Sequence, residues 1–175
     1  MGHAKATEFS PLKIAVLTVS DSRTKDNDTS GDALQGRLEE AGHYLTGREI
    51  VADDIYKMRE TVSRWIADPE VQVVISTGGT GLTGRDSTPE ALMPLFDKVI
   101  EGFGELFRAV SLKDIGASTI QSRAIAGLAN STLIFCLPGS TGACRTGWDE
   151  ILKEQLDIRT SPCNFAQMYP RMSEK

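Results

Sequence analysis

Apolar residues gather into short, uninterrupted runs that predict buried strands. Three such runs cover residues 13–19, 71–77 and 132–137. A strand covered on both faces of a parallel sheet reads as a continuous apolar run, whereas a half-exposed strand alternates with polar residues. A less regular stretch over 43–51 predicts a further strand. Residues 116–130 fit either a short strand or a helix.

Between these runs, apolar residues recur at helical spacing. The pattern predicts helices over residues 32–41, 55–66, 89–98, 102–112 and 143–155. Alternation of strands with helices indicates an α/β fold with a mainly parallel central sheet between helix layers. In such a sheet the carboxyl ends of the strands line one crevice, where ligands bind.

The chain has 175 residues, which suits one domain with a full core. We expect a flexible N-terminal arm over residues 1–12, a folded domain over 13–158 and a C-terminal tail over 159–175. The tail has little regular pattern, and four aromatic residues near the margins of the domain predict exposed apolar surface there. These four residues are Phe103, Phe107, Phe165 and Tyr169.

Composition indicates which kinds of partner and which cellular compartment to expect for the protein. The net charge of -5 argues against nucleic acid, so a polyanionic ligand needs a local positive site. No apolar run approaches membrane length, and the N-terminus lacks the apolar core of a signal peptide. The three cysteines form no C-x-x-C pair, which favours reduced thiols in a cytoplasmic protein. With only two histidines, metal or acid–base chemistry falls to carboxylates.

A glycine-rich loop follows the strand predicted at 71–77. Glycine has no Cβ, so the backbone can turn sharply and approach a ligand closely. Arg85 and Asp86 come next, and Thr88 is expected to cap a helix with Pro89 at its first position. This order of strand, glycine loop, charged pair and helix start is typical of phosphate sites. The candidate binding residues of this segment are Gly78, Gly79, Thr80, Gly81, Arg85, Thr88 and Glu90.

Residues 79–84 also match the dinucleotide-binding pattern G-x-G-x-x-G letter for letter. That pattern requires its last glycine inside the opening helix, and an acid about twenty residues further on at a strand end. Here the helix signal begins only at Thr88, and the acids at that distance, Glu101 and Glu105, lie in or next to a predicted helix. We therefore interpret the match as coincidental.

Three further polar segments follow predicted strands and belong to the same crevice. The first contains Ser20 and Asp21, and the second contains Asp53 and Asp54. The third is another glycine loop, with candidate residues Pro138, Gly139 and Ser140. Backbone N–H groups in glycine loops, together with acids, indicate a phosphorylated substrate bound with a divalent metal such as Mg²⁺.

Each of these acids also has a plainer interpretation. The role of Asp53 or Asp54 can be simply that of a helix N-cap, with no part in binding. Asp21 can be a turn residue. Asp86 can pair with Arg85 on the surface and contribute little. The glycine loop itself can be a turn that binds nothing.

The longest of these motifs resembles the signature of a known family. The sequence T-G-G-T-G-x-x-x-R-D-x-T-P-E over 77–90 is similar to that of the MoaB/Mog family of molybdenum cofactor biosynthesis proteins. Shorter matches are V-S-D-S-R at 19–23, D-T-S-G at 28–31, G-F-G-E at 102–105, S-R at 122–123 and L-P-G-S at 137–140. The tail sequence R-T-S-P-C-N-F at 159–165 resembles the MoaB branch.

The resemblance implies a three-layer α/β/α sandwich that assembles as a homotrimer or homohexamer. It also implies adenylyl transfer from Mg-ATP to molybdopterin, which yields adenylylated molybdopterin and pyrophosphate. By motif, Asp53 and Asp86 correspond to the catalytic aspartates that hold the metal, although the adjacent Asp54 leaves the first assignment open. The glycine loops would hold pterin and phosphate, with Ser20, Asp21, Thr88, Ser122 and Arg123 around them.

Two other functions compete with this one. Relatives that form assemblies can lose their chemistry, so the chain could be a non-catalytic molybdopterin-binding or scaffold protein. The presence of both Asp53 and Asp86 argues against that alternative. A nucleotide-dependent oxidoreductase would rest on the G-x-G-x-x-G match alone.

Overall fold

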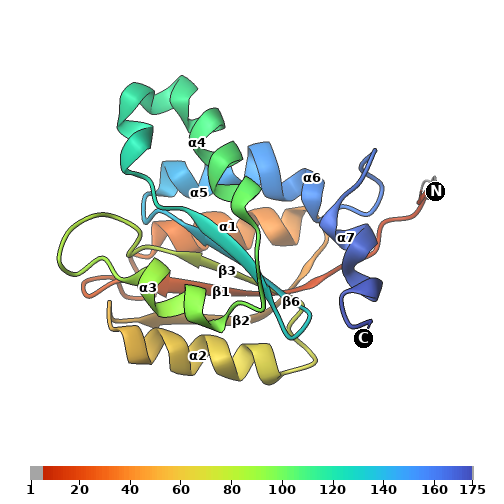
Figure 1. Ribbon diagram of the computed structural model, residues 1–175, viewed down its shortest axis with the longest axis horizontal. Helices are drawn as coiled ribbons and strands as arrows, with labels where there is room; N and C mark the ends of the chain where they lie inside the picture. The colour runs from red at the N-terminus through yellow and green to blue at the C-terminus, as the bar shows by residue number, and fades with distance from the viewer. Residues whose placement is uncertain (1–5, 175) are drawn as a thin grey trace.

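A six-stranded sheet forms the middle layer of the computed structural model, which describes residues 6–174 (Figure 1). The strands are β1 (Lys13–Val19), β2 (Tyr44–Val51), β3 (Val73–Thr77), β4 (Lys98–Val99), β5 (Ile125–Ala129) and β6 (Thr132–Leu137). Their order is β2-β1-β3-β6-β5-β4. The neighbouring pairs β2–β1, β1–β3 and β3–β6 are parallel. Strand β5 runs antiparallel to both of its neighbours, β6 and β4. The predicted α/β fold with a mainly parallel sheet is confirmed.

Helices cover both faces of the sheet (Figure 1). They are α1 (Thr29–Glu40), α2 (Ile55–Ala67), α3 (Thr88–Leu92), α4 (Glu101–Ile115), α5 (Thr141–Gly147), α6 (Lys153–Gln155) and α7 (Phe165–Met168). A π-helical turn, Trp148–Leu152, joins α5 to α6, so the helix predicted at 143–155 is present with one irregular turn. Helix α1 starts earlier than predicted because the Asp28 side chain accepts a hydrogen bond from Gly31 N at 3.0 Å and caps it.

Two separate apolar clusters show that the architecture is a three-layer sandwich. One cluster joins Leu34 of α1, Phe107 of α4 and Trp148 to one face of the sheet. The other joins the buried face of α2, including Met58, to the opposite face. Strand β1 feeds both clusters, because its successive side chains point to opposite faces of the sheet.

The helix predicted over 89–98 is shorter in the structure. Helix α3 ends at Leu92, a 3-10 turn spans Met93–Leu95, and the edge strand β4 follows. Pro94 lies in this turn and supplies no backbone N–H, which prevents the helix from continuing. The predicted cap is also wrong: Ser87 occupies the capping position without a side-chain hydrogen bond, and Thr88 is the first helical residue.

Segments whose pattern was ambiguous or irregular take defined forms. Residues 116–130 contain a 3-10 helix, Gly116–Gln121, followed by β5. The tail contributes α7, which Asn164 caps by accepting from Gln167 N at 2.7 Å. At the other end of the chain, the ring of Phe9 lies 5.1 Å from that of His43. Residues 1–5 of the predicted arm, with His3, lie outside the described residues.

The aromatic residues of α4 do not form apolar surface as expected. Phe103 and Phe107 are buried, because both point toward the sheet and pack with each other at 6.3 Å between ring centroids. The exposed apolar side chains of this region are aliphatic instead. They are Leu106, Leu112, Ile115 and Ile120, on α4 and the 3-10 helix after it.

We expect His43 to make the free energy of unfolding depend on pH. The ring is buried, its Nδ1 accepts from Leu12 N at 3.1 Å, and burial lowers its pKa to about 4 despite the nearby Asp157. Between pH 6.5 and 4 the unfolded chain therefore binds a proton that the folded chain excludes, so stability falls as the pH falls. The loss reaches at most about 3 kcal/mol. His43→Asn keeps an acceptor but does not titrate, and urea unfolding of both proteins should show a flatter pH profile for the variant. Parallel profiles would contradict the assignment to His43.

Candidate functional site

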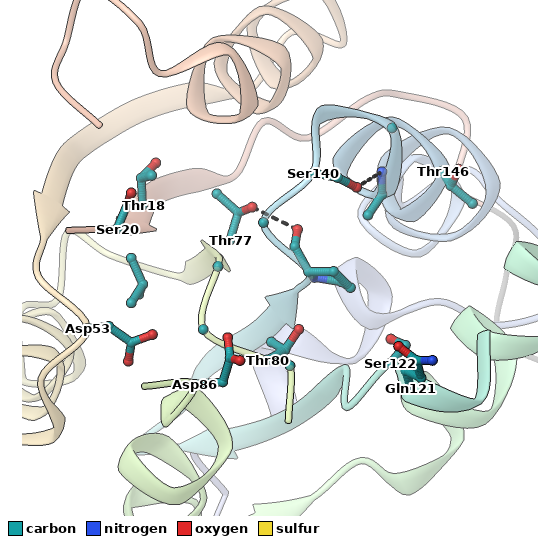
Figure 2. A pocket seen from close by; sticks show the side chains of 18 of the residues that line it. Thr18, Ser20, Asp53, Thr77, Thr80, Asp86, Gln121, Ser122, Ser140 and Thr146 are labelled. Carbon is teal, nitrogen blue, oxygen red and sulfur yellow. Dashed lines mark hydrogen bonds between the residues drawn. The ribbon is translucent and has the colours of Figure 1, made fainter. Parts of the chain in front are cut away.

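A cavity of about 890 Å³ opens at the carboxyl ends of β1, β3 and β6 (Figure 2). The four polar segments that follow β1, β2, β3 and β6 all contribute to its wall. Of the residues proposed from sequence, those that line it are Ser20, Asp21, Asp53, Gly78, Gly79, Thr80, Gly81, Asp86, Ser122, Pro138, Gly139 and Ser140. The parallel topology brings all of them except Ser122 together, because parallel strands end at the same edge of the sheet. Ser122 reaches this edge because β5 is antiparallel and starts there.

The glycine loop after β3 lies tightly on the end of the sheet. Gly78 and Gly79 have φ angles of +106° and +64°, where residues with a side chain are strained. A Cβ at Gly78 would come within 2.1 Å of the carbonyl oxygen of Val19, at the end of β1. Gly139 does not have a positive φ, but a Cβ there would lie 3.2 Å from Gly78 Cα. The two glycine loops therefore pack against each other.

Asp86 lies over this loop with its carboxylate ionised. Its Oδ2 accepts a hydrogen bond from Thr83 N at 2.8 Å, and the Thr83 hydroxyl donates to the same oxygen. The Thr83 hydroxyl, helped by the backbone N–H groups of Thr83 and Gly81, holds the pKa of Asp86 below its usual value. Figure 2 shows Asp86 beside Thr80 on the side of the cavity where Asp53 also lies.

The two adjacent acids after β2 have different roles in the structure. Asp54 caps α2, because its Oδ1 accepts from Tyr56 N at 2.9 Å and from Lys57 N at 3.0 Å. Asp53 lines the cavity, and its Oδ1 accepts from the Ser87 hydroxyl at 2.8 Å. Asp53 is thus the acid of this pair that is placed to meet a ligand.

Four residues proposed as binding residues lie outside the cavity lining: Arg85, Thr88, Glu90 and Arg123. Arg85 is 80% exposed and pairs with Asp21 at 2.6 Å. Thr88 is buried, and its hydroxyl donates to Gly78 O at 2.8 Å. Arg123 pairs with Glu90 and donates to backbone carbonyls of the loop over 80–86.

Arg23 belongs to the site and the buried Asp28 lies behind it, although sequence reasoning selected neither residue. Arg23 lines the cavity, donates to Gly139 O at 3.4 Å and lies 3.5 Å from the Asp28 carboxylate. Burial alone would raise the pKa of Asp28, but hydrogen bonds from Gly31 N, Thr18 and Arg48 outweigh it and lower the pKa. The position of Asp28 just before a helix was the signal that could have identified it as a buried cap.

The opposite wall of the cavity comes from α4, the 3-10 helix after it and the start of α5. Gln121 and Ser122 lie there, across the cavity from Asp53 and Asp86 (Figure 2). The other residues of this wall are Phe107, Ser111, Asp114, Ile115, Ser118, Gly142, Ala143 and Thr146. Sequence reasoning missed them because single residues on amphipathic helices, polar or apolar, have no spacing that distinguishes a cavity wall.

Charge in the cavity is unbalanced. Four aspartates line it, namely Asp21, Asp53, Asp86 and Asp114, and among the described residues Arg23 is the only basic residue that does. Within the same part of the chain, no group of three or more His, Cys, Asp or Glu side chains is arranged to hold a metal by itself. An anionic ligand here therefore needs backbone N–H groups, Arg23 and a cation that arrives with it.

The structure also bears on the G-x-G-x-x-G match and on the absence of a predicted membrane span. Gly84 precedes the start of α3 at Thr88, so the last glycine of the G-x-G-x-x-G match lies outside the helix, as predicted. None of the helices described over residues 6–174 is long and apolar enough to cross a membrane.

Comparisons with known proteins agree with one another. A family model described as a probable molybdopterin binding domain matches residues 15–157. Molybdenum cofactor biosynthesis protein B of Escherichia coli K12 is 58% identical over 91% of this chain and 94% of its own. The protein of the same name from Bacillus cereus is 44% identical over 83% of this chain and 86% of its own.

Solved structures give the same result. A crystal structure of molybdenum cofactor biosynthesis protein B has a TM-score of 0.82 at 43% identity, covering 84% of this chain and 92% of that one. The tungsten cofactor synthesizing protein MoaB of Pyrococcus furiosus has a TM-score of 0.79 at 34% identity, covering 94% and 98%. The family model, the sequence identity and the fold agree, and the chain belongs to the MoaB/Mog family of molybdenum cofactor biosynthesis proteins.

Proposed function

We propose that the chain transfers the adenylyl group of Mg-ATP to the terminal phosphate of molybdopterin, giving adenylylated molybdopterin and pyrophosphate. The observation that carries this proposal is the arrangement of Asp53 and Asp86. Both line the cavity beside the glycine loop, and Asp54, which could have replaced Asp53, is engaged as a helix cap. The chain's membership in a family of cofactor biosynthesis proteins supplies the substrate class.

The residues present fit a magnesium ion shared with a nucleotide. Mg²⁺ binds one or two carboxylates and completes its shell with phosphate oxygens and water. Asp53 and Asp86 can supply those two carboxylates, and the hydrogen bonds from Thr83 favour the ionised form of Asp86 by lowering its pKa. The bound ion would offset negative charge on the phosphates. A lining with four aspartates and one arginine favours ATP that enters with its metal rather than free ATP.

Little acid–base chemistry is required of the protein. The phosphate of molybdopterin is already a nucleophile; one of its oxygens attacks the α-phosphorus of ATP, and the bond to pyrophosphate breaks. Repulsion between two anions is the obstacle, and positioned donors reduce it. Arg23 and the backbone N–H groups of Gly79 and Thr80 can supply such donors from one side of the cavity, whereas Gly78 N already donates to Leu137 O. The wall opposite, with Gln121 and Ser122, encloses the other part of the substrates.

We also propose that the chain forms a homotrimer or a pair of trimers in the cytoplasm. The exposed aliphatic side chains of α4 and the turn after it, Leu106, Leu112, Ile115 and Ile120, supply apolar surface of the kind that oligomers bury. Light scattering at micromolar concentration should give three or six times the chain mass of 19.0 kDa. A monomer under these conditions would contradict this proposal.

The reaction is tested by incubating the purified protein with Mg-ATP, with and without molybdopterin. Adenylyl transfer predicts pyrophosphate release that requires molybdopterin, together with a product heavier than molybdopterin by one adenylyl group in the mass spectrum. The non-catalytic binding or scaffold alternative predicts binding of molybdopterin with no pyrophosphate. Absence of binding would overturn both.

A further inference from the structure

Arg123 contacts the glycine loop from outside the cavity. Its Nε donates to Gly81 O at 2.9 Å and to Thr80 O at 3.2 Å. Its second terminal nitrogen donates to Gly81 O at 2.6 Å and to Asp86 O at 3.1 Å, and the remaining one pairs with Glu90. One guanidinium therefore joins three backbone carbonyls to a carboxylate at the start of α3.

The position of Arg123 in the fold explains this reach. It lies two residues before the start of β5, which is separated from β3 by β6 in the sheet. The side chain passes beyond the end of the sheet to the loop that follows β3. It is 27% exposed, so much of its length is packed against protein. The planar fork of five N–H donors in arginine suits several fixed acceptors, whereas lysine offers a single ammonium head.

The Arg123 contacts also determine which way the loop's N–H groups point. In a trans peptide the C=O and the following N–H point in opposite directions. The carbonyl of Thr80 is directed to Arg123, and the N–H of the same peptide, on Gly81, therefore points to the other side, where it helps to lower the pKa of Asp86. Arg123 also binds the carbonyl of Asp86 itself. One residue thus orients both the backbone of Asp86 and the Thr80–Gly81 peptide that faces it.

We infer that Arg123 is a positioning residue that, with Glu90 as its minor partner, holds the loop over 80–86 so that Asp86 faces the cavity. Arg123 acts through the loop and does not contact the substrate. The effect on turnover rests on the proposed adenylyl transfer, whereas the effect on loop order does not. A phosphate-binding role for Arg123 predicts instead that its loss weakens molybdopterin binding.

The test compares Arg123→Gln, Arg123→Lys and Glu90→Gln with the wild-type protein. Hydrogen exchange of peptides covering residues 78–88, molybdopterin titration and single-turnover rates at saturation are measured for each. Arg123→Gln should raise exchange of the loop amides by about tenfold, while the core strands keep their protection. The single-turnover rate should fall by about a hundredfold. The dissociation constant of molybdopterin should change by less than about threefold.

The two other variants separate geometry from charge and from folding. Arg123→Lys keeps the charge but cannot span the carbonyls, so most of the defect in exchange and rate should remain. Glu90→Gln leaves the carbonyl contacts in place and removes one half-exposed ion pair, so its losses of loop protection and of rate should be well below those of Arg123→Gln. If Arg123→Gln fails to fold, Arg123→Lys and Glu90→Gln still test the inference.

Three outcomes would overturn the inference: unchanged loop exchange in Arg123→Gln, full recovery in Arg123→Lys, or loss of molybdopterin binding equal to the loss of rate. If the wild-type protein shows no adenylyl transfer, the proposed function fails. Loop exchange and the titration then still decide whether Arg123 positions the loop.

Discussion

Replacing Asp86 with asparagine should reduce the single-turnover rate of adenylyl transfer on the order of a thousandfold. The substitution removes a negative charge from the cavity at the point where we propose that the metal-bound phosphates lie. An asparagine oxygen can still accept the hydrogen bonds from Thr83, so the loop should keep its form. The free energy of unfolding should therefore change by less than about 1 kcal/mol.

The matched comparison uses the two acids after β2. Asp53→Asn should reduce the rate as strongly as Asp86→Asn, because Asp53 is the other carboxylate beside the glycine loop. Asp54→Asn should leave the rate unchanged, since asparagine caps a helix about as well as aspartate. Rapid-quench measurements at saturating ATP and molybdopterin check all three variants. Wild-type rates for Asp86→Asn, or a loss confined to Asp54→Asn, would show that the acids are wrongly assigned.

Gly78→Ala should be among the most destabilising single changes in the chain. The added Cβ would lie 2.1 Å from Val19 O and 3.1 Å from Val19 C, which are backbone atoms of β1 that cannot rotate away. The positive φ of +106° adds strain of its own. Together these effects should lower the free energy of unfolding by about 3 kcal/mol or more.

Gly84→Ala is the control from the same loop, because nothing lies within 4 Å of a Cβ built there and its φ is not positive. Urea unfolding should show a large shift of the midpoint for Gly78→Ala and almost none for Gly84→Ala. Equal midpoints for the two variants would mean that the loop can relax away from β1, contrary to the close packing of Gly78 against Val19 O.

Hydrophobic pattern was enough to predict the layers of the fold. Continuous apolar runs identified β1, β3 and β6, because strands covered by helices on both faces have no solvent-exposed face with polar residues. The pattern could not predict β4, which has two exposed residues and pairs only through its backbone. It also extended α3 too far, because the apolar spacing continues past Pro94 while the backbone turns.

The site could be predicted where chemistry follows the order of the chain. Glycine loops and acids at strand ends are placed together by the parallel topology, so their shared cavity needed no knowledge of packing. The roles of Thr88 and Arg123 could not be predicted, because a sequence does not show whether a polar side chain points into a cavity or holds its wall from behind. Arg23 was missed for the same reason, since its contact with Gly139 O joins segments far apart in the chain.

The central claim is that the α-phosphate of ATP, with its adenosine, moves to molybdopterin. The most direct measurement is to supply ATP labelled with ³²P at either the α or the γ position and to follow the label in the presence of molybdopterin. Adenylyl transfer predicts that the α label appears on the pterin product and the γ label appears only in pyrophosphate. A γ label on molybdopterin, or ATP that remains intact while molybdopterin binds, would contradict the account.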